Sequence, residues 1–136
     1  MGLKRRLVAG LVLGAVFVLI EFLVNGVFLR ALYRETTALW RPESEMKSLM
    51  WLMALGQFFF GTLFGIVYAK GYEPRRAPLG QGVRYGLIMG LMLAPMNALV
   101  WYVVLPVPVA LAAAWIVAGF AEMLILGVAA SQIYKP

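Results

Sequence analysis

The sequence contains neither cysteine nor histidine. Disulfide bonds, thiolate or imidazole metal sites, and catalysis by either side chain are therefore excluded for this chain. Charged residues are also scarce, at 13% of 136 residues. No nucleophile, phosphate-binding loop or metal-binding motif accompanies them. We therefore expect a protein that is not an enzyme and that uses no cofactor.

Apolar surface is what the sequence has in abundance. Hydrophobic residues make up 63% of the chain, and the mean hydropathy is +0.88. This composition leaves too little polar surface to cover a soluble globule. The apolar runs consume most of the length, so no separate soluble domain is expected. The sequence predicts an all-α integral membrane protein with a single transmembrane domain over residues 1–136 and the lipid bilayer as a partner.

Four apolar runs are each long enough to cross a hydrocarbon core of about 30 Å at about 1.5 Å per residue. The expected spans are residues 7–29, 48–69, 83–105 and 109–131. The first run exceeds the ~7 to 15 residues of a secretory signal core, so we expect it to be retained. The segment 31–47 is typical of a short interfacial element that ends in the first turn of the second helix at Pro42, Glu43 and Glu45. Pro95 predicts a kink in the third span.

The distribution of positive charge predicts the orientation of the bundle. An N-in, C-in arrangement places eight basic residues in the cytoplasm, namely Lys4, Arg5, Arg6, Lys70, Arg75, Arg76, Arg84 and Lys135. Four basic residues then lie outside, namely Arg30, Arg34, Arg41 and Lys47. Cytoplasmic loops carry the excess of Lys and Arg, so this arrangement is favoured. The net charge of +6 is then explained by topology and by anionic lipid headgroups, and nucleic acid is not an expected partner.

An internal repeat relates the first and third spans at an offset of 76 residues. The pattern of residues 10–14 recurs at residues 86–90, and Glu21 then aligns with Asn97. A weaker match at an offset of 66 relates the second and fourth spans. The sequence therefore predicts a four-helix bundle built from two related helical hairpins.

Small residues form a stripe along each of the four spans, at the spacing of neighbours on one helix face. Such stripes are packing surfaces, because lipid offers no hydrophobic drive and helices associate through close backbone contact. The residues expected to pack helices together are Gly10, Gly14, Gly61, Gly65, Gly86 and Gly90.

Amides and carboxylates lie at similar depth in all four spans. The candidate intramembrane polar site consists of Glu21, Asn25, Gln57, Asn97 and Glu122. Convergence of these groups is economical, because a lipid-facing carboxylate at mid-membrane costs at least ~2.5 to 3.5 kcal/mol. The three amides are expected to form hydrogen bonds between helices, with substrate contact as the alternative.

The two acids allow three interpretations. If Glu21 and Glu122 approach each other, they cannot both ionise comfortably, so the pair should hold a proton. It would then act as a proton relay, as a cation site with the amide oxygens, or as a protonated strut. The spacing of the residues does not choose among these. Methionines at helical spacing, such as Met46, Met50 and Met53, are interpreted as gap-filling core residues and not as a copper site, so no metal is expected.

Some segments carry a resemblance to known families. The segments 38–46, 68–73 and 105–108 resemble small bacterial four-helix membrane proteins, which implies a multi-pass protein of the bacterial inner membrane and transfers no site. The acid in Ile20-Glu21-Phe22 is similar to the glutamate in the first helix of small multidrug resistance transporters. This chain departs from them in its longer first connection, in Glu122 and in its charge bias.

Two functions are consistent with these observations. The first is a non-enzymatic accessory subunit or self-assembling bundle, in which the polar centre specifies packing within a homo-oligomer or a larger membrane complex. The alternative is a small transporter of protons, a cation or a lipophilic solute, in which Glu21 and Glu122 are the coupling groups.

Overall fold

The computed structural model describes residues 2–135, and the chain is 86% helical. The long helices are α1 (Leu3–Leu23), α3 (Glu43–Lys70), α4 (Pro78–Val104) and α5 (Val109–Ile133). A π-helical turn, Val24–Phe28, follows α1, and the short helix α2 (Arg30–Glu35) and a 3-10 turn, Thr37–Leu39, lead to α3. The described residues contain no strand, and the expected all-α class is confirmed.

Four helical segments are long and apolar enough to cross a membrane. They are Leu3–Phe28, Glu43–Lys70, Pro78–Val104 and Val109–Ile133. The second and third begin earlier than expected, because α3 begins directly after Pro42 and α4 begins at Pro78, and both prolines precede the apolar runs. Pro42 caps α3 and does not occupy its first turn, whereas Pro78 is the first residue of α4. Helix α4 continues through Pro95.

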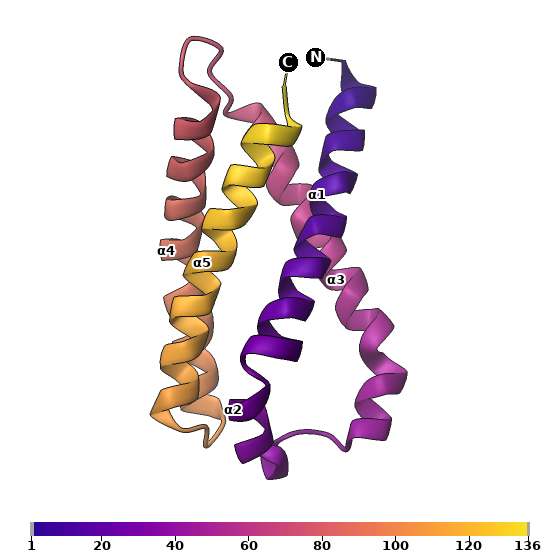
Figure 1. Ribbon diagram of the computed structural model, residues 1–136, viewed down its shortest axis with the longest axis vertical. Helices are drawn as coiled ribbons and strands as arrows, with labels where there is room; N and C mark the ends of the chain where they lie inside the picture. Colours follow the sequence, from indigo (N-terminus) through magenta and orange to yellow (C-terminus); the bar gives the residue numbers. More distant parts are fainter. Residues whose placement is uncertain (1, 136) are drawn as a thin grey trace.

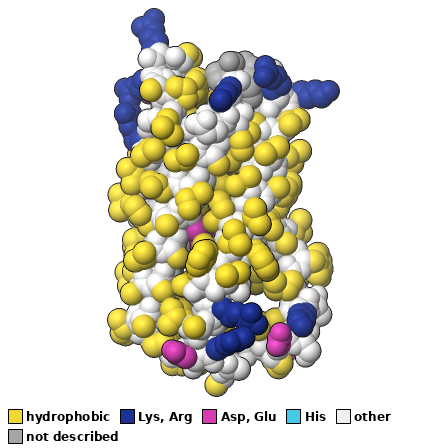
Figure 2. Space-filling model, viewed as in Figure 1, with side chains coloured by type: hydrophobic (Ala, Val, Ile, Leu, Met, Phe, Trp, Pro, Cys, Tyr) yellow, Lys and Arg dark blue, Asp and Glu magenta, His cyan; other side chains and the backbone are white. Residues whose placement is uncertain are grey.

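The long helices form two antiparallel pairs, α1 with α3 and α4 with α5 (Figure 1). The pairs meet mainly along α1 and α5, so these two are the inner helices. Both chain termini and the connection between α3 and α4 lie at one end, hereafter the terminal end (Figure 1). The other two connections lie at the opposite end. Basic side chains dominate the terminal end, whereas basic and acidic side chains lie together at the opposite end (Figure 2).

Glycines let α1 and α3 approach closely. A Cβ atom on Gly61 would lie 2.8 Å from the Cα of Gly14, and one on Gly65 would lie 3.3 Å from the Cα of Gly10. An added side chain would therefore collide with the facing backbone at Gly61 and with the Leu13 side chain at Gly65. The sequence-based assignment of these four glycines to a packing surface agrees with their contacts.

The second helix pair, α4 and α5, also packs through glycines, but in a different register. A Cβ atom on Gly86 would lie 2.6 Å from the Met123 carbonyl oxygen, and one on Gly90 would lie 3.0 Å from the ring of Phe120. In the internal repeat, Gly14 aligns with Gly90 and Gly61 aligns with Gly127. Because Gly61 contacts Gly14, the repeat predicts that Gly127 contacts Gly90. Gly127 instead meets the backbone of Gly86. The two pairs thus differ by one helical turn, and the internal repeat stays a prediction.

Tyrosines join the two pairs at the terminal end. The ring of Tyr68 on α3 lies 5.6 Å from that of Tyr85 on α4 and 6.0 Å from that of Tyr134 after α5. The Tyr85 hydroxyl donates to the Phe64 carbonyl oxygen at 2.9 Å. This cluster holds α3 close to α4 near the terminal end.

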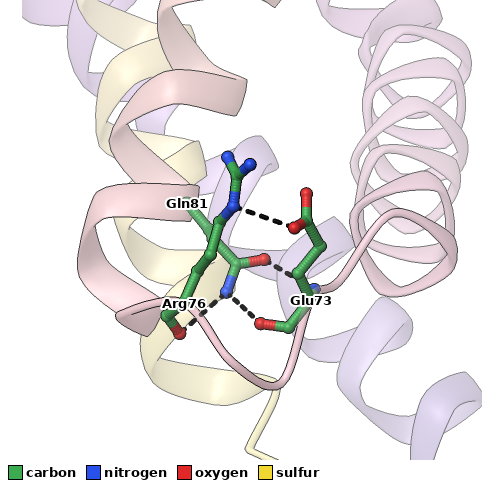
Figure 3. Close-up of polar contacts among 3 residues, drawn as sticks. All are labelled: Glu73, Arg76 and Gln81. Carbon is green, nitrogen blue, oxygen red and sulfur yellow. Dashed lines mark hydrogen bonds and ion pairs between the residues drawn. The ribbon is translucent and has the colours of Figure 1, made fainter.

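A glutamine closes the connection between α3 and α4 (Figure 3). The Gln81 side chain accepts from the Glu73 backbone N–H at 2.8 Å and donates to the carbonyl oxygens of Glu73 and Arg76 at 2.8 and 3.1 Å. An ion pair of 2.8 Å joins Arg76 to Glu73. One side chain therefore satisfies three backbone groups of this turn.

Candidate functional site

The two acids of the membrane spans meet at the contact between the inner helices. Glu122 on α5 is buried, with 7% of its surface exposed, and its side chain lies close to that of Glu21 on α1. Glu21 itself is half-buried. Acidic atoms are visible at mid-height of the apolar belt in Figure 2. The structure thus brings together the two carboxyl groups that sequence analysis singled out.

A hydrogen bond between two carboxyl groups requires a proton. Ionised carboxylates only accept hydrogen bonds, so one partner must be protonated to donate. Two fully ionised carboxylates would repel each other in this low-dielectric setting, so a proton held by the pair stays a prediction.

Asn25 extends this pair along the first span. Its amide nitrogen donates to the Glu21 carboxylate at 2.9 Å and to the Glu21 backbone carbonyl at 3.3 Å. Asn25 belongs to the π-helical turn Val24–Phe28, a conformation frequent at functional sites. Sequence analysis did not predict this turn.

Tyr33 and Trp115 complete the chain of hydrogen bonds. The Tyr33 hydroxyl on α2 donates to the Asn25 amide oxygen at 2.8 Å and accepts from the Trp115 indole N–H on α5 at 2.7 Å. We call Glu21, Asn25, Tyr33, Trp115 and Glu122 the polar network. It connects the first span to α5 through Glu21 and Glu122, and it connects α2 to α5 through Tyr33 and Trp115.

Burial raises the pKa of the Tyr33 hydroxyl above its ordinary value of 10.0, the Trp115 hydrogen bond lowers it, and the nearby Glu21 and Glu122 raise it. Tyr33 is consequently a neutral O–H donor at physiological pH.

An aromatic cluster covers the network toward the opposite end. The Trp40 ring lies 5.6 Å from the ring of Tyr33 and 6.3 Å from that of Trp115, in edge-to-face arrangements. The Trp40 indole N–H donates to the Thr36 hydroxyl at 2.8 Å. The sequence predicted a short interfacial element over residues 31–47, which includes Tyr33 and Trp40, and assigned Trp115 no role. Their convergence depends on the fold of residues 30–40.

Gln57 and Asn97 form no hydrogen bond with the polar network within residues 2–135, so hydrogen bonds do not join all five residues of the expected site. The buried side of α4 follows Gly90, Ala94 and Ala98, and Asn97 lies about 100° around the helix from Ala98. Asn97 is therefore exposed, and Gln57 is half-buried on α3.

The Asn25 amide presents its nitrogen, and not its oxygen, to the acid pair. The Asn25 amide oxygen, which a hard cation would need, accepts from Tyr33, and the amide nitrogen faces Glu21. Among the described residues, no group of three or more acidic side chains is placed to hold a metal ion.

No protein-family model, curated protein or solved structure matches the chain. The resemblance to small multidrug resistance transporters therefore stays a prediction. Function must be argued from the geometry of the polar network.

Proposed function

We propose that the protein is a non-enzymatic membrane bundle, acting as an accessory or self-assembling subunit, in which the polar network fixes the relative position of the two helix pairs. The observation that carries this proposal is the burial of Glu122 close to Glu21 at the contact of α1 with α5. Each pair is held internally by glycine contacts. The contact between the pairs is where a specific polar link is needed.

Membrane energetics supports this role. Lipid tails provide no hydrophobic drive for helix association, so polar contacts decide which faces meet. Separating α1 from α5 would expose Glu122 to lipid at a cost of at least ~2.5 to 3.5 kcal/mol. Only the arrangement that pairs the acids avoids this cost.

The exposed amide of Asn97 supports the assembly part of the proposal. Asn97 lies seven residues before the end of α4, about 10 Å inside the helix at 1.5 Å per residue. An amide at this depth gains by bonding to another helix. A second copy of this chain or a partner subunit would provide that helix, in the N-in, C-in orientation and bacterial inner membrane expected from the sequence.

The proposal is tested by substitutions that keep or remove hydrogen bonding. E122Q mimics a protonated acid, so it should retain the fold and oligomeric state. E122L removes the link and should loosen the contact between pairs. Crosslinking between cysteines introduced on α1 and α5, in the otherwise cysteine-free chain, measures that contact. Equal crosslinking in both variants would contradict the proposal.

A small transporter is the second candidate function, and an open groove favours it. The groove, of about 600 Å³, lies at the opposite end and is lined by Met53 on α3, Trp101 on α4 and Trp40. Gln57 and Asn97 occupy positions one turn deeper than Met53 and Trp101 on their helices. A lipophilic solute entering here would approach both amides.

Flux measurements separate the two functions. The variants E21Q and E122Q are reconstituted in liposomes under a pH gradient, with wild-type protein as the reference. Loss of pH-dependent flux with unchanged assembly would support transport and refute the accessory role. Unchanged or absent flux, with assembly lost in E122L, would support the accessory role.

A further inference from the structure

A second open groove lies at the terminal end, between the start of α1 and the end of α5. Its volume is about 460 Å³. The side chains that define its character are Lys4, Arg5, Val8, Val12, Ile133 and Lys135. The groove is distant from the polar network, which follows the later half of the first span.

The groove changes character along its length. Lys4 and Arg5 lie in the first turn of α1, and Lys135 follows the last turn of α5. Val8 and Val12 follow Lys4 at intervals of four residues, so the same face of α1 becomes apolar one and two turns deeper. Ile133 contributes a further apolar wall. A cationic mouth above an apolar channel fits an amphiphile, because the mouth can bind an anionic headgroup and the channel can hold an apolar chain.

Within residues 2–135, the three cations of the mouth form no ion pair with an acidic side chain. The ion pairs formed within residues 2–135 are Arg41–Glu45, Lys47–Glu43 and Arg76–Glu73. None of them includes a residue of the groove. At the terminal end, the acid Glu73 is already bound by Arg76. Three converging positive charges are therefore available to an anion.

We propose that this groove binds an anionic phospholipid of the bilayer. The phosphate lies among Lys4, Arg5 and Lys135, and one acyl chain follows Val8 and Val12. Basic pockets between transmembrane helices recognise anionic headgroups in this way. The apolar wall distinguishes a lipid from a free phosphate ion, which would gain nothing from the valines. The inference stands whether the protein is a subunit or a transporter.

Native mass spectrometry of the full chain in detergent tests the proposal. Phosphatidylglycerol and phosphatidylcholine are the probes. The variant K4Q/R5Q/K135Q removes the three positive charges of the mouth. The control K70Q/R75Q/R84Q removes the same number of charges from exposed positions near the terminal end but outside the groove. Circular dichroism checks that both variants fold.

We expect wild-type protein and the control to retain phosphatidylglycerol in preference to phosphatidylcholine. The groove variant should bind phosphatidylglycerol at least 10-fold more weakly. Equal losses in both variants would show general surface attraction and overturn the site. Unchanged binding in the groove variant would also overturn it.

Competition distinguishes a lipid from a free anion. Inorganic phosphate and glycerophosphoglycerol, the headgroup without acyl chains, should not displace the lipid at equimolar concentration. Displacement by either would show that the apolar wall contributes nothing and would overturn the lipid assignment.

Discussion

Replacing Gly61 with alanine should force α1 away from α3. The new Cβ atom would lie 2.8 Å from both the Gly14 Cα and the Phe17 Cβ, and 2.9 Å from the Leu13 carbonyl oxygen. Favourable carbon–carbon contacts are about 3.5–4.0 Å, so the helices must separate by roughly 0.7–1.2 Å. Two of the three facing atoms belong to the backbone, so no rotamer change relieves the collision.

The magnitude follows from comparison with Gly56 on the same helix. A Cβ atom on Gly56 meets nothing within 4 Å. Both substitutions gain the helix propensity of alanine, up to about 1 kcal/mol, and only G61A pays the overpacking cost of about 1–3 kcal/mol. G61A should therefore be less stable than G56A by about 1–3 kcal/mol.

Equilibrium unfolding in mixed micelles, titrated with SDS and followed by circular dichroism, measures this difference. The expected order of stability is G56A at or above wild type, with G61A below both. Equal stability of the two variants would refute the argument that backbone contact at Gly61 holds α1 against α3. Crosslinking between α1 and α3 provides a second readout of the same separation.

Three further predictions concern the polar network and the turn before α4. Y33F removes two hydrogen bonds between helices, so the free energy of unfolding should fall by about 1 kcal/mol at the average of ~0.6 per bond. The fluorescence of Trp115 should also change. Unaltered stability and emission would contradict the network. The pKa of Tyr33 in the folded protein is raised above 10.0. The stability that the Tyr33 hydroxyl contributes to the fold is therefore complete below pH 10 and declines as the pH rises above that value. Wild type should accordingly lose more stability than Y33F between pH 8 and pH 11, and equal losses would contradict this. Q81A should speed tryptic cleavage at Arg75 and Arg76 several-fold relative to the control Q132A, which lies outside this turn; equal rates would contradict the role of Gln81.

The sequence alone is sufficient to identify the four spans, because hydropathy over about 20 residues is a local property. The glycine stripes are equally local, since positions four residues apart share a helix face. Gly10, Gly14, Gly61 and Gly65 could therefore be assigned to packing before any contact was known. The same reasoning selected Glu21 and Glu122, because acids in apolar spans must avoid lipid.

Local patterns failed where the outcome depended on how the pairs dock. Similar depth grouped Asn97 with Glu21, yet depth says nothing about the direction in which a side chain faces. The buried side of α4 is taken by small residues that contact α5. The amide of Asn97 is consequently turned outward.

The sequence by itself determined which segments are long and apolar enough to cross a membrane and which faces permit close approach, because both follow from composition and helical period. Tertiary structure decided that α1 and α5 are the inner helices and that the acids of these two helices lie close together. It also joined Tyr33 to Trp115 across 82 residues of chain. Such contacts require the docking of two helix pairs, and no helical period records how one pair meets another.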